Sequence, residues 1–117
     1  MSEFKVTYKG NFSTEMVHLE SGKKIITDAP KDNQGLGRTF SPTDLVASSL
    51  ASCMMTIMAI SMQKHMIDLK GTKASVKKTM MSEPRMISQI DITITFPKTY
   101  TDKIKTILER SALNCPV

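Results

Sequence analysis

A stretch of 19 residues without a charged side chain, residues 45–63, limits most strongly what this chain can fold into. A helix of this length and apolar character either spans a membrane or lies buried in a protein core. Six polar residues dilute the apolar character, namely Ser48, Ser49, Ser52, Thr56, Ser61 and Gln63. The remainder of the chain has the mixed polar and apolar pattern of a soluble domain. The sequence therefore predicts a buried helix and no membrane span.

The motif Ser-Pro-Thr-Asp just before this stretch is a helix start signal. Ser41 can accept a backbone hydrogen bond as the N-cap, and Pro42 suits the first helical position. Asp44 places a carboxylate near the positive end of the helix dipole. We predict a helix from this motif to about His65 or Met66, where a charged segment containing glycine follows.

A helix that is apolar almost all round needs cover on every side. A chain of 117 residues with short flanking elements would have difficulty providing it alone. A second copy could cover one side, since two-fold dimers are the commonest oligomers. Small residues such as Ala47, Ala51 and Ala59 would permit a close approach. We expect a homodimer whose core includes this helix.

Alternating apolar and polar residues predict strands on both sides of the helix. The expected strands are 3–9, 14–20, 23–28, 72–80 and 86–96. Between the third strand and the helix, residues 28–40 are expected to form a loop rich in Gly, Asn, Asp and Pro. A second, amphipathic helix is expected from Thr101 and Asp102, with Ile104, Ile107, Leu108 and Ala112 on its inner face. The order βββ-α-ββ-α indicates one α+β domain over residues 1–117, with antiparallel sheets around the long helix.

The charge pattern argues against nucleic acid as a partner. The net charge is +5, but the 13 lysines are scattered, and no aromatic residues alternate with them. The first ten residues lack the apolar core of a signal peptide, so we expect a cytoplasmic protein. The two histidines and two cysteines have no metal-ligand spacing. No metal, no cofactor and no membrane or nucleic-acid partner is expected.

The two cysteines each allow two interpretations from the residues alone. Cys53, inside the uncharged stretch, is either a small buried apolar residue or a reactive thiol that needs a group to favour its thiolate. Cys115 is followed by Pro116, an arrangement found at helix N-termini, where a thiolate is stabilised. It could equally be an ordinary exposed cysteine. In a reducing compartment such a pair is more often inert or redox-active than a structural disulfide.

Two motifs together resemble a known family. The segment SPTDLVASSLASCMMTIM (41–58) and the distant NCPV (114–117) are similar to the two cysteine motifs of the OsmC/Ohr family, the osmotically inducible and organic-hydroperoxide-resistance proteins. The segment SEPRMISQIDITITF (82–96) resembles the OsmC-like branch of that family. The resemblance implies an intertwined α+β homodimer with two long central helices and active sites at the subunit interface. Family members continue past the second cysteine through a further helix and strand, which this chain is expected to lack.

The resemblance also implies an activity. It predicts a thiol-dependent peroxidase, peroxiredoxin-like in its chemistry, that reduces organic or fatty-acid hydroperoxides in the response to oxidative stress. Cys53 matches the peroxidatic cysteine and Cys115 the resolving cysteine, with a small dithiol as reductant. An alternative is a non-catalytic dimer that binds a small apolar ligand in a Met-lined pocket at its interface.

The first motif departs from that of the better-characterised peroxidases of the family. They have a glutamate directly after the proline, paired with an arginine that activates the cysteine. Here that position is Thr43, and the acid, Asp44, comes one residue later, as in the OsmC-like branch. Arg38 is the nearest candidate for the activating arginine, and Arg85 is the alternative. Asp44 could instead serve only the helix dipole, and either arginine could be an ordinary surface residue.

Overall fold

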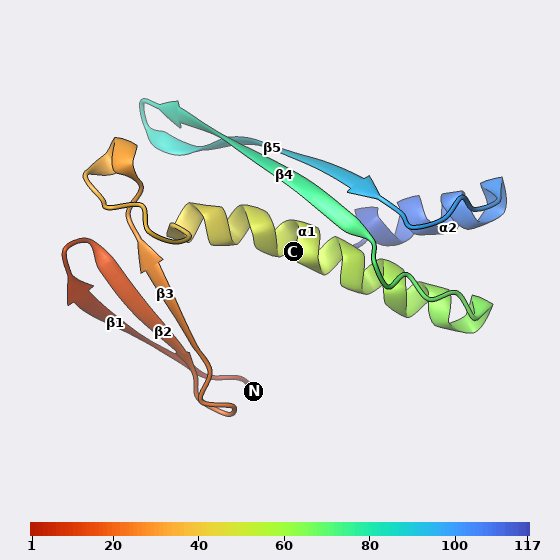
Figure 1. Cartoon of the computed structure of the whole chain (residues 1–117), viewed down its shortest axis with the longest axis horizontal. Helices are drawn as coiled ribbons and strands as arrows, with labels where there is room; N and C mark the ends of the chain where they lie inside the picture. Colours follow the sequence, from red (N-terminus) through yellow and green to blue (C-terminus); the bar gives the residue numbers. More distant parts are fainter. The chain divides into compact units, whose positions relative to one another are not determined.

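The computed structural model describes all 117 residues and divides into two compact units, Met1–Leu45 and Val46–Val117. The element order is three strands, a long helix, two strands and a second helix (Figure 1). This order and the antiparallel pairing within each sheet confirm the predicted α+β class and the sequence βββ-α-ββ-α. The single domain over residues 1–117 stays a prediction.

The first unit is built on an antiparallel sheet in the order β1-β2-β3. Its strands are β1 (Phe4–Gly10), β2 (Ser13–His18) and β3 (Lys24–Asp28). The predicted alternation is present, but the apolar face of β1 is not buried within one chain. Phe4, Val6 and Tyr8 are each more than 60% exposed, at 63%, 62% and 62%. An exposed apolar face of this kind is typical of a surface that packs against another part of a protein assembly.

The loop after β3 folds back on itself around Gly35. A Cβ atom at this position would lie 1.7 Å from the carbonyl oxygen of Ala29, so only glycine fits there. A short 3-10 helix, η1 (Lys31–Asn33), and a backbone hydrogen bond from Gly37 to Ala29 complete the turn. The loop thereby returns Arg38 to the end of β3, where Asp28 lies.

The helix α1 (Pro42–Met62) begins at the predicted signal. The Ser41 Oγ accepts from the Asp44 backbone N–H at 3.1 Å, and the Ser41 N–H donates to the Asp44 carboxylate at 2.9 Å. This reciprocal pair is a capping box with aspartate in place of the usual glutamate. A 3-10 helix, η2 (Gln63–His65), follows α1 directly, and Met66 ends it in a left-handed conformation with a φ of 55°. The predicted end at His65 or Met66 is therefore confirmed.

The burial of α1 within one chain is partial, and the homodimer expected to cover the rest stays a prediction. Its buried residues are Ala47, Ala51, Met58 and Met62. Val46 and Ile60 are more than half exposed, at 54% and 57%. The segment Pro42–His65 is long and apolar enough to cross a membrane by length and composition, a test that core helices of soluble proteins also pass.

The second unit packs two strands and two helices around a methionine-rich core. It contains most of α1, the antiparallel pair β4 (Lys73–Ser82) and β5 (Arg85–Thr95), and α2 (Asp102–Leu113). A bulge in the β4–β5 register leaves Ser88 without an opposite residue. The buried cluster is Met58, Met62, Leu69 and Leu108. Ile104, Ile107 and Ala112 of α2 pack on it, which confirms the predicted inner face of that helix.

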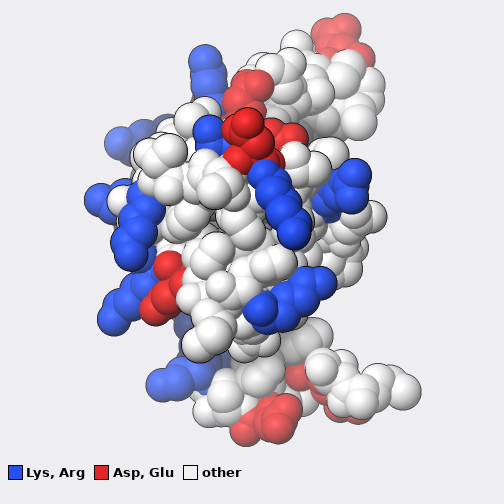
Figure 2. All heavy atoms as spheres, turned by 90° about the vertical axis from the view of Figure 1, so that its right-hand side faces the viewer, with Lys and Arg blue, Asp and Glu red and all other residues white.

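The net positive charge of the chain belongs to the second unit. Val46–Val117 contains ten Lys and Arg against five Asp and Glu, whereas Met1–Leu45 contains six of each. On the face shown in Figure 2 the basic side chains are dispersed among uncharged surface and do not form one continuous band. Dispersed lysines are typical of a solvated surface.

Candidate functional site

The two cysteines, 62 positions apart in the sequence, meet in the second unit. Cys53 lies near the middle of α1, and Cys115 follows the end of α2. The helix α2 runs back along α1, so that the C-terminus of the chain lies beside the middle of α1 (Figure 1). Both thiols are free and partly buried, and they lie close enough for Cys53 to affect the pKa of Cys115.

The surroundings of Cys115 disfavour its thiolate. Burial raises the pKa of the Cys115 thiol above its usual value, the neighbouring Cys53 raises it further, and a hydrogen bond from the Val117 backbone acts in the opposite direction. A thiol attacks a peroxide only as the thiolate. The raised pKa lowers the fraction of Cys115 that is present as a thiolate at neutral pH, so its surroundings do not prepare it for attack on a peroxide.

The backbone around Cys115 is fixed by the C-terminal cap of α2. The Asn114 side-chain amide donates to the Arg110 carbonyl at 2.7 Å, and the Cys115 N–H donates to the Ala112 carbonyl at 3.3 Å. Cys115 thus follows the carbonyl end of a helix. That end carries a partial negative charge, so the dipole of α2 does not favour a thiolate there.

Arg38, the candidate activating arginine, forms a bidentate ion pair with Asp28 within the first unit. The Nε donates to Oδ2 at 2.8 Å, Nη2 donates to Oδ1 at 3.0 Å, and the Arg38 backbone N–H donates to Oδ2 at 2.9 Å. The Asp28 side chain is 2% exposed and that of Arg38 is 61% exposed. The sequence analysis missed Asp28, because a single acid at a strand end gives no signal of which loop residue will return to it.

The ion pair makes a prediction about acid stability. Hydrogen bonding to Arg38 lowers the pKa of Asp28 from 3.8 to about 2, against the opposing effect of burial. Ionised Asp28 therefore stabilises the fold fully above about pH 4 and stops doing so as the pH falls through 2. We expect Asp28→Asn to lower the urea midpoint at pH 5 and to reduce the loss of stability between pH 4 and pH 2.

Urea unfolding followed by circular dichroism at several pH values measures this effect. Asp68→Asn is the matched control, because Asp68 is an exposed carboxylate whose side chain accepts from the Lys70 backbone N–H. An Asp28→Asn protein with the stability and acid profile of the wild type would contradict the role given to the ion pair.

The remaining predicted site residues have structural partners of their own. Asp44 caps α1 through Ser41, as described above, and Thr43 lies with its hydroxyl 3.1 Å from the Ser41 Oγ. Arg85 begins β5 and is exposed. Asp44 and Arg38 belong to the unit Met1–Leu45, whereas both cysteines belong to Val46–Val117. The catalytic roles of Asp44 and Arg38 stay predictions.

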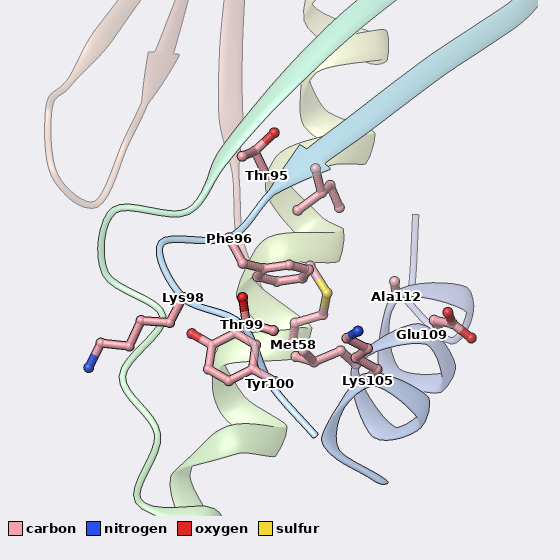
Figure 3. A pocket seen from close by; sticks show the side chains of 11 residues that line it. Met58, Thr95, Phe96, Lys98, Thr99, Tyr100, Lys105, Glu109 and Ala112 are labelled. Carbon is pink, nitrogen blue, oxygen red and sulfur yellow. The ribbon is translucent and has the colours of Figure 1, made fainter. Parts of the chain in front are cut away.

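A pocket of about 540 Å³ opens in the second unit between the end of β5, the following loop and α2 (Figure 3). Its apolar lining includes Met58, Phe96 and Leu108, and the ring of Tyr100 meets that of Phe96 edge to face, with 5.8 Å between their centres. Lys98 and Lys105 also line it. The volume is in the range of small-molecule sites, and neither cysteine lines it.

No group of three or more His, Cys, Asp or Glu side chains lies close enough together in the structure to hold a metal ion.

The family model for OsmC-like proteins matches residues 34–117, which include the α1 motif and both cysteines. This chain belongs to the OsmC-like family. The match confirms the resemblance noted in the sequence. None of the curated proteins compared with this chain matches it.

Solved structures of OsmC-like proteins share the fold. A protein from Psychrobacter arcticus 273-4, provisionally named an osmotic stress induced and detoxification response protein, is 51% identical with a TM-score of 0.95, over 99% of this chain and 85% of that chain. An organic hydroperoxide resistance protein OsmC from Legionella pneumophila is 14% identical with a TM-score of 0.72, over 99% of this chain and 85% of that chain. An OsmC-like protein from Mycoplasma pneumoniae is 17% identical with a TM-score of 0.73, over 99% and 83%. The last two show the fold alone.

Proposed function

We propose that this OsmC-like protein is a thiol-dependent peroxidase for organic hydroperoxides. The observation that carries the proposal is the contact between two free thiols, Cys53 on α1 and Cys115 after α2. Two reduced cysteines in contact can pass from thiols to a disulfide without a large movement of the backbone. The name of the Legionella relative, an organic hydroperoxide resistance protein, supports the choice of substrate class.

The reaction has three balanced steps. The Cys53 thiolate attacks the outer peroxide oxygen, the O–O bond breaks, and the alkoxide takes a proton to leave as an alcohol while Cys53 becomes a sulfenic acid. The Cys115 thiol then attacks the Cys53 sulfur, which forms the disulfide and releases water. A dithiol reduces the disulfide by thiol–disulfide exchange and is itself oxidised to a disulfide. The raised pKa of Cys115 is consistent with its acting second.

Trapping of the sulfenic acid tests this proposal. The wild-type protein should consume cumene hydroperoxide in the presence of dithiothreitol, and brief exposure to hydroperoxide in the presence of dimedone should label Cys53. Peptide mass spectrometry locates the label. The proposal would be contradicted if the wild-type protein neither consumed hydroperoxide nor formed the dimedone adduct at Cys53.

A second candidate function is the binding of a small apolar ligand without catalysis. The pocket of about 540 Å³ lined by Met58, Phe96 and Leu108 favours it, since its floor is apolar and its volume suits a small molecule. Saturable binding of an apolar fluorescent probe that Phe96→Ala weakens, together with thiols that do not react with hydroperoxide, would favour this function over the peroxidase.

We also propose that the protein acts as a homodimer in the cytoplasm. The exposed apolar residues Val46 and Ile60 of α1, and Phe4, Val6 and Tyr8 of β1, are more than a single soluble chain is expected to leave uncovered. Free thiols also persist best in a reducing compartment. Sedimentation equilibrium should give twice the mass of the chain, and a monomer at micromolar concentration would contradict the proposal. Recovery of the protein in a membrane or extracellular fraction would contradict the compartment.

A further inference from the structure

A hydrogen bond between two serine side chains joins α1 to α2. The Ser111 Oγ lies 2.8 Å from the Ser61 Oγ, in a partly buried position, although the two residues are 50 positions apart in the sequence. Both residues belong to the second unit, as do the cysteines. The sequence analysis treated Ser61 only as a polar residue that dilutes an apolar helix.

The two hydroxyls form a chain in which every proton has an acceptor. The Ser111 Oγ is also 2.8 Å from the Ile107 carbonyl, and the Ser61 Oγ is 2.9 Å from the Met58 carbonyl. A hydroxyl donates one proton. Ser111 donates to Ser61, and the Ser61 hydroxyl can donate in turn to the Met58 carbonyl of its own helix. The contact is therefore satisfied, and it is directional in a way that apolar contacts are not.

The serine pair is close to both cysteines in the sequence of its helices. Cys53 precedes Ser61 by eight residues on α1, and Cys115 follows Ser111 by four residues at the end of α2. The two helices run in opposite directions (Figure 1). Because Cys53 precedes Ser61 and Cys115 follows Ser111, both cysteines lie to the same side of the serine contact. At a rise of 1.5 Å per residue, Cys53 is about 12 Å along α1 from Ser61.

The other contacts between these helices do not fix their register as well. Leu108 packs against Met58 and Met62 in the buried cluster. Burial of apolar surface is non-directional, and methionine side chains adapt readily to small shifts of their neighbours. A small sliding or rotation of α2 on this cluster would displace Cys115 from Cys53, and the serine hydrogen bond opposes that displacement.

We propose that Ser61 and Ser111 are positioning residues that hold Cys115 against Cys53 and so favour formation of their disulfide. This inference rests on the proposed peroxidase function. Without the serine contact, the reduced protein gains freedom at the end of α2, and disulfide formation must then remove that freedom. The disulfide becomes easier to reduce. The loss of one neutral hydrogen bond corresponds to about a three- to tenfold change in the equilibrium constant.

The reduction potential of the Cys53–Cys115 disulfide measures this effect. Wild-type protein, Ser111→Ala, Ser61→Ala and the double variant are equilibrated with mixtures of reduced and oxidised dithiothreitol, and mass spectrometry of the alkylated protein gives the oxidised fraction. We expect each single variant to raise the potential by about 15 to 30 mV, the equivalent of that three- to tenfold change for two electrons. The double variant should match the singles, because either change already removes the contact.

Two further variants separate positioning from general stability. Ser111→Thr keeps a hydroxyl and should keep a potential close to that of the wild type. Thr106→Val removes an exposed side-chain hydrogen bond within α2, from Thr106 Oγ1 to the Asp102 carbonyl, and should leave the potential unchanged. Thermal unfolding of the reduced proteins is measured in parallel, since a purely structural role would lower stability without changing the potential.

The outcomes distinguish this inference from the function on which it rests. Alanine variants with the wild-type potential would overturn the positioning role and leave the peroxidase intact. A wild-type protein that forms no Cys53–Cys115 disulfide with either hydroperoxide or diamide would overturn the proposed resolving step and the positioning role together.

Discussion

Cys53→Ser is expected to reduce the consumption of cumene hydroperoxide to the background rate measured without protein. A serine hydroxyl stays protonated at neutral pH and cannot form a sulfenic acid, so the first step of the proposed reaction has no nucleophile. Cys115 is not expected to replace it, because burial raises the pKa of its thiol. The loss should therefore be complete and should not depend on the concentration of the reductant.

Serine differs from cysteine by one atom, and Cys53 is only partly buried, so the variant should fold. Equal thermal unfolding of the wild type and Cys53→Ser, both reduced, checks this. Ser52→Ala is a matched control on the adjacent, exposed position of α1 and should retain full turnover. Hydroperoxide consumption by Cys53→Ser at the wild-type rate would sink the proposal that Cys53 is the nucleophile, because Cys115 would then be the only thiol left to explain it.

The arrangement of elements could be predicted from the sequence because each element carries its own local signal. The strand periods, the Ser41 cap and the Thr101 cap all lie within a few residues of the structure that they specify. The inner face of α2 was predicted for the same reason, since its apolar period is visible in the helix itself. Contacts of this kind need no information about distant parts of the chain.

The contacts between residues far apart in the sequence could not be predicted from local patterns. The Asp28–Arg38 ion pair depends on how tightly the intervening loop folds around Gly35, and the Ser61–Ser111 contact depends on the register of two helices 50 positions apart. A serine on an apolar helix has the same sequence pattern whether it faces solvent or another hydroxyl. Tertiary packing decides between the two.

The cysteine pair is an intermediate case. Each cysteine alone allowed an inert interpretation, and the resemblance of the two motifs to one family was what paired them. The structure adds the physical content, a contact between Cys53 and Cys115 and a raised pKa at Cys115. The cover of α1 by a second copy stays a prediction, because the sequence indicates that a face needs cover and not what covers it.

Cys115→Ser is expected to leave the first step intact and to remove the second. One equivalent of hydroperoxide should be consumed at the wild-type rate when no reductant is present, since Cys53 is unchanged. The sulfenic acid at Cys53 should then persist, because no thiol lies beside it to form the disulfide and release water. Dimedone labelling of Cys53 should therefore be stronger and longer-lived than in the wild type.

The persistent sulfenic acid also exposes Cys53 to further oxidation. With excess hydroperoxide, Cys115→Ser should accumulate the sulfinic acid at Cys53 and lose activity irreversibly over successive turnovers, whereas the wild type is protected by its disulfide. Intact-protein mass spectrometry follows both species, and the double variant Cys53→Ser, Cys115→Ser should gain no oxygen at either position. If Cys115→Ser instead turned over repeatedly with dithiothreitol, without extra labelling or overoxidation, Cys115 would have no part in resolution and the contact between the thiols would be a feature of packing alone.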